Sequence, residues 1–155
     1  MRPCGVILLV RELFVVESLS QVYQIISAYF CLYGWPKYLG FDNGCRLWDT
    51  AQATLKKVCN ELTLAFAKLI IVIDRYHGKT HKDPRCKKQF NMNCHAELKG
   101  VDSQICEQTF RWLAGYKHTT KHMNKSRYNI FLIRVACMHN ENKKASPAMS
   151  VELDN

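Results

Sequence analysis

Two carboxylates lie where an acidic side chain could take part in metal chemistry. Asp42 directly follows the short apolar segment 37–41, and Glu107 lies near the start of a predicted helix. Carboxylates at the carboxyl ends of strands in α/β sheets point into the ligand crevice. Two such acids can share Mg²⁺ ions, which activate the attacking oxygen and stabilise the leaving oxygen of a phosphoryl displacement. The alternative is that Asp42 is a turn residue and that Glu107 is an acid favoured by the helix dipole.

A second group combines histidine and cysteine in a polar segment, with the spacing H-x3-H-x4-C-x7-C. Its members are His77, His81, Cys86 and Cys94. These residue types are the usual ligands of Zn²⁺, and a zinc clip could order a long loop that has little core. Cys45 or His95 could take the place of Cys94. The alternative is a set of unconnected polar residues in a loop.

A third group is cationic. Lys117, Lys121 and Lys125 repeat every four residues, and His118 and His122 do the same. This spacing predicts a cationic stripe on one helix face, which could follow a phosphate backbone. The alternative is a solvated helix face.

The net charge is concentrated in one half of the chain. The formal charge is +9; residues 1–74 carry 7 basic and 6 acidic side chains, whereas residues 75–144 carry 15 basic and 5 acidic ones. A basic half of this strength favours a polyanionic partner, with DNA or RNA as the first candidate.

Strands and helices alternate around these groups. The predicted order is a strand or hairpin in 4–16, a helix from Ser18 or Ser20 to Tyr33, a strand at 37–41, a helix over 46–67, a buried strand at 69–73, a helix starting at Ser103 and a helix over 126–139. Such alternation predicts an α/β fold, with helices packed on a mixed or parallel sheet. Residues 74–103 form a long polar insertion, and loops of this length are usually functional or metal-stabilised.

Other features narrow the class of protein. The strongly apolar runs without a charge, such as 69–73, are far shorter than the roughly 20 residues that a membrane span needs. We therefore expect no membrane partner. The 155 residues suit one domain, and the eight scattered cysteines are expected to be reduced, because a chain of this length does not need disulfides to fold.

Five segments resemble, in order, the Kyakuja–Dileera–Zisupton (KDZ) transposases. They are CGVILLVREL with ESLSQVY behind it, PKYLGFDNGCRL, VIDRYHGKTHKDPRC, GVDSQICEQTFRWLAGYK and MNKSRYNIFLIRV. The resemblance implies a nuclear, DDE-type transposase that acts on DNA with Mg²⁺ or Mn²⁺ and often works as a multimer. It matches the D-x-x-C aspartate to Asp42 with Cys45, the catalytic glutamate to Glu107, and the His-rich stretch to His77, His81 and Cys86.

The implied fold is ribonuclease H-like and incomplete. It would cover 3–139, with 74–103 as the insertion and 140–155 as a flexible tail. The family's first catalytic aspartate lies upstream of the CGVILL segment, and here no acid precedes Glu12. Asp74 also ends an apolar segment, but the family keeps a non-catalytic position there. We therefore expect a transposase fragment that is inactive unless another chain supplies the missing part. The alternative is a non-catalytic nucleic-acid-binding or co-opted interaction module.

Overall fold

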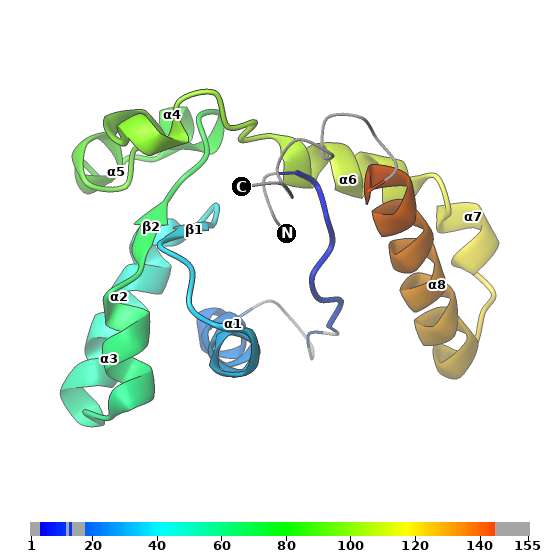
Figure 1. Cartoon of the computed structure of the whole chain (residues 1–155), viewed down its shortest axis with the longest axis horizontal. Helices are drawn as coiled ribbons and strands as arrows, with labels where there is room; N and C mark the ends of the chain where they lie inside the picture. Colours follow the sequence, from blue (N-terminus) through cyan, green and yellow to red (C-terminus); the bar gives the residue numbers. More distant parts are fainter. Residues whose placement is uncertain (1–3, 12, 14–17, 145–155) are drawn as a thin grey trace. The chain divides into compact units, whose positions relative to one another are not determined.

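The computed structural model describes residues 4–11, 13 and 18–144, which fall in two compact units. We call Arg11–Ser103 the sheet unit, and Met1–Val10 together with Gln104–Asn155 the helical unit. Figure 1 labels the elements of both units. Each unit is described by itself below.

The sheet unit contains a two-stranded parallel sheet. Its elements are α1 (Leu19–Tyr33), β1 (Tyr38–Gly40), α2 (Gly44–Lys57), α3 (Glu61–Ala67), β2 (Ile70–Val72), α4 (His77–Thr80), α5 (Arg85–Lys88), and the 3-10 turns η1 (Met92–Cys94) and η2 (Ala96–Leu98). Leu39 pairs with Ile71, and an isolated bridge between Ile73 and Asn91 follows β2. Parallel strands need a crossover connection, which α2 and α3 supply. The predicted α/β character is therefore confirmed for a small sheet within a helix-rich chain.

The helix predicted to begin at Ser18 or Ser20 is confirmed, with Ser18 as its N-cap and Gly34 as its C-cap. The Ser18 hydroxyl accepts a hydrogen bond from the Gln21 backbone N–H at 3.2 Å. Gly34 ends the helix with a φ of 92°, and its N–H donates to the Phe30 carbonyl. A side-chain oxygen at the start and a glycine at the end satisfy backbone groups that the helix leaves unpaired.

The single helix predicted over 46–67 is wrong, because the chain forms α2 and α3 there. The Asn60 side chain accepts from the Thr63 N–H, and the Thr63 hydroxyl accepts from the Asn60 N–H, both at 3.0 Å. This reciprocal arrangement is a capping box, which starts a new helix. Asn and Thr side chains compete for backbone hydrogen bonds and favour caps over helix interiors.

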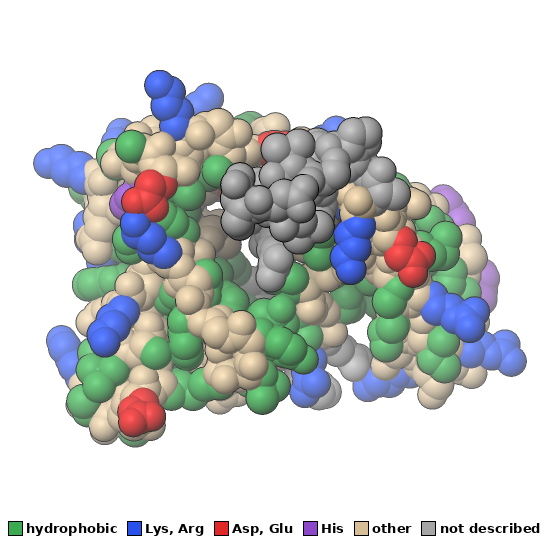
Figure 2. Space-filling model, viewed as in Figure 1, with side chains coloured by type: hydrophobic (Ala, Val, Ile, Leu, Met, Phe, Trp, Pro, Cys, Tyr) green, Lys and Arg blue, Asp and Glu red, His purple; other side chains and the backbone are tan. Residues whose placement is uncertain are grey.

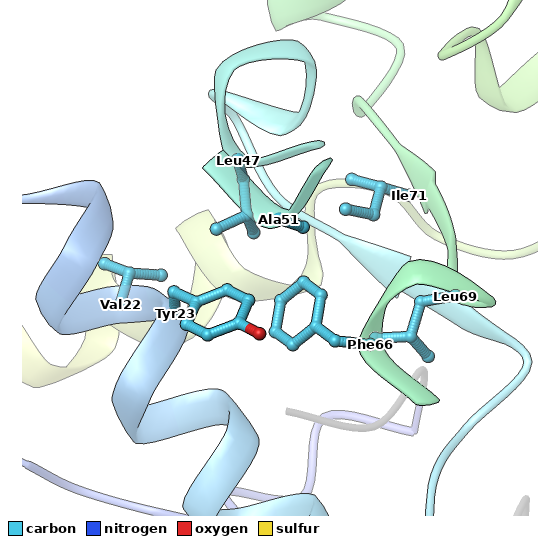
Figure 3. Close-up of a cluster of buried hydrophobic side chains, with 7 residues drawn as sticks. All are labelled: Val22, Tyr23, Leu47, Ala51, Phe66, Leu69 and Ile71. Carbon is cyan, nitrogen blue, oxygen red and sulfur yellow. The ribbon is translucent and has the colours of Figure 1, made fainter. Parts of the chain in front are cut away.

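The main core of the sheet unit lies between α1, α2, α3 and the sheet. Figure 3 shows its buried side chains, among which the rings of Tyr23 and Phe66 lie 4.3 Å apart between centroids. Phe66 and Leu47 have no solvent exposure. This apolar packing holds the helical crossover against the strands.

Over its described residues, 4–10 and 104–144, the helical unit contains three helices and an N-terminal segment. The helices are α6 (Ile105–Ala114), α7 (Lys117–Thr120) and α8 (Lys125–Lys144). The predicted strand or hairpin in 4–16 is not seen over the described residues 5–11 and 13, which have no regular secondary structure; residues 12 and 14–17 lie outside the described part. Ile7 instead exchanges two 2.8 Å hydrogen bonds with the Asn140 side chain, and the Gly5 carbonyl accepts from the His139 ring. Side chains of α8 thus satisfy the backbone groups that a neighbouring strand would otherwise pair.

Helices α6 and α8 differ from their predicted bounds. Gln104, rather than Ser103, is the N-cap of α6, and it makes no side-chain capping bond. α8 continues to Lys144, five residues beyond the predicted end, and residues 145–155 lie outside the described part. Over the described residues, no helix has both the length and the apolar character needed to cross a bilayer.

Candidate functional site

Two acidic side chains lie at the same edge of the parallel sheet. β1 and β2 are in register with Gly40 opposite Val72, and the Phe41 N–H donates to the Val72 carbonyl at 3.0 Å. Asp42 and Asp74 each follow their strand by two residues, so the register carries both to the carboxyl end of the sheet. This is the edge where α/β proteins bind ligands.

His77 joins these two acids to form the first group of potential ligands, which we call the acidic group. Asp42, Asp74 and His77 each offer one ligand atom, and these atoms all lie within 4.8 Å of one another. The His77 Nδ1 is hydrogen-bonded to Asp74 Oδ2 and lies 3.6 Å from Asp42 Oδ1. Since an ionised carboxylate only accepts, the His77 Nδ1–H donates this hydrogen bond to Asp74.

The two acids of this group are held differently. Asp74 Oδ1 accepts from the backbone N–H groups of Tyr76 at 2.7 Å and His77 at 3.0 Å, and only 14% of the Asp74 side chain is exposed. The Asp42 side chain is 69% exposed. Asp74 is therefore fixed by its own loop, whereas the position of Asp42 depends on the turn that starts α2. Carboxylate oxygens are the ligands that Mg²⁺ and Mn²⁺ prefer.

Cys45, His81 and Cys86 form the second group, which we call the thiol group. The His81 Nδ1 lies 3.7 Å from the Cys45 Sγ and 3.3 Å from the Cys86 Sγ. Zn–S and Zn–N bonds of about 2.3 and 2.1 Å at a tetrahedral angle place nitrogen and sulfur about 3.6 Å apart. The three atoms thus have the separation of ligands on one ion, and the group could hold a metal such as zinc.

Burial governs the protonation of the Cys86 thiol. Cys45 and Cys86 are 5% and 1% exposed. Burial, and then the neighbouring Cys45 thiol, raise the pKa of Cys86 to about 11. Without a cation, Cys86 is therefore protonated at neutral pH. A bound metal requires the thiolate, so metal binding releases a proton.

The structure divides the predicted zinc ligands between these two groups. His81 and Cys86 lie in the thiol group, but His77 lies with the acids. Cys45, the predicted alternative to Cys94, is the second cysteine of the thiol group. Cys94 is exposed and belongs to neither group of potential ligands found among the described residues. The physical reason is local: Cys45 is buried in the first turn of α2, whereas Cys94 ends the exposed turn η1.

An ion-pair network holds α5 against α2 beside the thiol group. Arg85 donates to both carboxylate oxygens of Asp49, at 2.7 and 2.9 Å, and to Asp83 at 2.7 Å. The hydrogen bond from Arg85 is the main cause that lowers the pKa of each carboxyl. Asp49 lies one helical turn after Cys45, and Arg85 precedes Cys86. The bidentate pair therefore aligns the two segments that supply the thiols.

Arg75 orders the other end of the insertion, and nothing in the sequence pattern identifies its role. Its guanidinium donates to the Asn93 side chain at 2.7 Å and to the backbone carbonyls of Val101 at 2.7 Å and Leu98 at 3.0 Å. Carbonyls at turn ends need donors when no helix or sheet pairs them. One side chain next to Asp74 thus closes a loop of more than 20 residues.

Glu107 lies in the helical unit, in the first turn of α6, and is half-buried. Its placement agrees with the predicted helix start. Its approach to Asp42, which the resemblance implies, stays a prediction.

The three stripe lysines are exposed in the helical unit, but they do not share one helix. Lys117 opens α7, Lys121 caps its end and Lys125 opens α8. The predicted continuous helical stripe is therefore wrong. The Asn124 side chain accepts from the Arg127 N–H at 3.0 Å and starts α8 as a new helix. Both units nevertheless carry more Lys and Arg than Asp and Glu on the face shown in Figure 2.

Comparison with known families identifies the chain. A family model described as KDZ, Kyakuja-Dileera-Zisupton transposase, matches residues 4–140. The chain belongs to the KDZ transposase family. The match includes both groups of potential metal ligands as well as Glu107 and the three stripe lysines. All the candidate functional residues of this KDZ chain therefore lie in its transposase-derived part. Neither a curated protein nor a solved structure matches it.

Proposed function

We propose that this KDZ chain contributes part of a DDE-type site for DNA strand cleavage and transfer during transposition in the nucleus. The observation that carries the proposal is the acidic group at the carboxyl end of β1 and β2, in which Asp42 lies within ligand distance of Asp74 and His77. The parallel strands with a helical crossover are compatible with a ribonuclease H-like fold, and we propose that fold for the complete domain.

The donor set fits a hard divalent cation. The acidic group would hold Mg²⁺ or Mn²⁺ through Asp42, with Glu107 as the further ligand that the resemblance implies for the complete enzyme, and the ion would supply charge stabilisation to the attacking and leaving oxygens. His77 donates to Asp74 and faces Asp42, so it orients the carboxylates toward one point. The thiol group, with its soft donors, would hold zinc as a structural centre.

DNA is the proposed partner. Residues 104–144 of the helical unit contain eight Lys and Arg side chains against two acids. Such an excess favours binding to the phosphate backbone, independently of base sequence. Other copies or a further chain would complete the assembly. The same excess supports a second candidate function, a non-catalytic nucleic-acid-binding module.

We propose that the 155-residue chain by itself does not cut DNA efficiently. The resemblance implies three catalytic carboxylates, and residues of this chain match two of them, Asp42 and Glu107. In-line displacement needs metal on both reacting oxygens, and Mg²⁺ tolerates incomplete coordination poorly. Loss of one member of such a set typically lowers the rate by roughly 10³-fold or more. We therefore expect no more cleavage of plasmid or hairpin DNA, with Mg²⁺ or Mn²⁺, than an Asp42→Ala variant gives.

The Asp42→Ala variant is the matched control for contaminating nucleases. Equal, background-level cutting by the two proteins agrees with the proposal. Metal-dependent cutting that the substitution abolishes would show that the chain is an active enzyme on its own. Cutting that also requires Asp74 would then identify Asp74 as the third carboxylate.

A further inference from the structure

Two chain segments each supply a ligand to both the acidic group and the thiol group. The turn that leads into α2 supplies Asp42 to one group and Cys45 to the other. The segment around α4 supplies His77 to the acidic group and His81 to the thiol group. Neither group can therefore change its spacing without moving a segment that carries a ligand of the other.

The connections within each segment are short and rigid. Gly44 lies between Asp42 and Cys45, its N–H donates to the Phe41 carbonyl at 3.0 Å, and a side chain at Gly44 would come within 2.9 Å of Ile71. The α2 turn is therefore packed directly on β2. His77 and His81 are separated by the single turn of α4, whose Gly78 N–H donates to the Asp74 carbonyl at 3.0 Å.

The contacts that hold His81 in the thiol group are weaker than those that hold Asp74 in the acidic group. Cys86 is held next to Cys45 by burial and by the Arg85–Asp49 pair. His81 is only half-buried, and in the described contacts its Nδ1 is hydrogen-bonded only to the two sulfurs. S–H groups are weak donors. An ion bound to both thiolates and to His81 would replace these weak contacts with metal–ligand bonds.

We propose that a soft metal ion in the thiol group is the positioning centre of the acidic group. Zinc bound by Cys45, His81 and Cys86 fixes the α2 turn against α4, and this brings Asp42 to Asp74 and His77 so that a hard divalent cation binds there. This inference rests on the proposed function, because it assumes that the acidic group binds the cation. Cys45, His81 and Cys86 act through Asp42 and His77, so they are positioning residues.

Asp74 has a defined part in this arrangement. It is the fixed side of the acidic group, since its loop and His77 hold it whether or not zinc is bound. Asp42, exposed and carried on the α2 turn, is the side that zinc positions. Asp74→Asn should therefore weaken cation binding and leave zinc in place. Asp42→Asn should do the same.

The test measures Mn²⁺ binding to the whole chain by electron paramagnetic resonance in three states: zinc-loaded, stripped of zinc with a chelator, and reloaded. Mn²⁺ is the probe because its free and bound forms are distinguishable and it accepts carboxylate ligands. We expect removal of zinc to weaken Mn²⁺ binding at least tenfold and reloading to restore it. Cys86→Ser should reproduce the stripped state, and Cys94→Ser, the matched control in the same insertion, should behave as the unmodified chain.

A second measurement covers the case in which the stripped chain loses its fold. Coupling between two sites is reciprocal, so Mn²⁺ must tighten zinc binding by the same factor. Competition against a zinc-binding dye, with and without Mn²⁺, measures this in the folded protein. We expect the tightening in the unmodified chain and its loss in Asp74→Asn.

The outcomes separate this inference from the proposed function. Mn²⁺ that binds through Asp42 and Asp74 with equal strength in the zinc-loaded and stripped states, without a reciprocal effect on zinc, overturns the inference and leaves the proposed function standing. Absence of Mn²⁺ binding in the zinc-loaded chain, or binding that Asp42→Asn does not weaken, overturns the metal site of the proposed function and the inference with it.

Discussion

Replacing Cys86 with serine is expected to lower zinc affinity by about 100-fold or more and to reduce zinc content from about one ion per chain to near zero. The Cys86 sulfur is almost completely buried and lies 3.3 Å from the His81 Nδ1. A serine hydroxyl is a poor zinc ligand, and it would not be deprotonated at neutral pH. Metal analysis of the purified protein, followed by titration with a competing chelator, measures both quantities.

Cys94→Ser is the matched control for this substitution. Cys94 belongs to the same insertion but is exposed and lies outside the thiol group. It should retain zinc with unchanged affinity. Zinc content that falls with Cys94→Ser and not with Cys86→Ser would show that the ion is bound by the ligand set first expected from the H-x3-H-x4-C-x7-C spacing.

DNA binding is expected to weaken by about 10³-fold between 50 and 200 mM salt if some six phosphates are contacted. Each phosphate contact releases condensed counterions, so the slope of log affinity against log salt is proportional to the number of phosphate contacts. Replacing Lys117, Lys121 and Lys125 together with alanine should weaken binding to every DNA sequence alike. It should also flatten the slope of log affinity against log salt by about 3. Fluorescence anisotropy of labelled duplexes measures both effects.

A triple variant with the same charge change provides the comparison. Lys56, Lys57 and Lys68 are exposed on α2 and at the end of α3 in the sheet unit. Their replacement should change the slope less than replacement of the stripe lysines does. Equal effects of the two triples would assign DNA affinity to overall charge, and unchanged affinity in both would make the three stripe lysines a solvated surface.

Local signals in the sequence predict much of the sheet unit. The serine and glycine caps of α1, the apolar segment that contains β2 and the turn after β1 are all short-range features, and the structure confirms them. The errors arise where one polar side chain decides a boundary. Asn60 and Asn124 each start a new helix within a pattern that otherwise reads as continuous, because their side chains cap backbone N–H groups.

The sequence also identifies most of the potential metal ligands, but not how they are grouped. Residue type and spacing draw attention to His77, His81 and Cys86, whereas the strand register that brings Asp74 to Asp42 is a non-local property. His77 and His81 lie at opposite ends of one short helix, and only their surroundings determine which one meets acids and which one meets thiols. Spacing alone carries no information about those surroundings.

This KDZ chain is expected to hold two adjacent metal sites of opposite chemical character. X-ray absorption at the zinc and manganese edges, on protein loaded with both ions, tests it most directly. We expect about two sulfur ligands near 2.3 Å with one nitrogen at the zinc edge, and only oxygen and nitrogen ligands at the manganese edge. Zinc without sulfur ligands, or manganese whose signal is unchanged when Asp42 and Asp74 are replaced by asparagine, would contradict it.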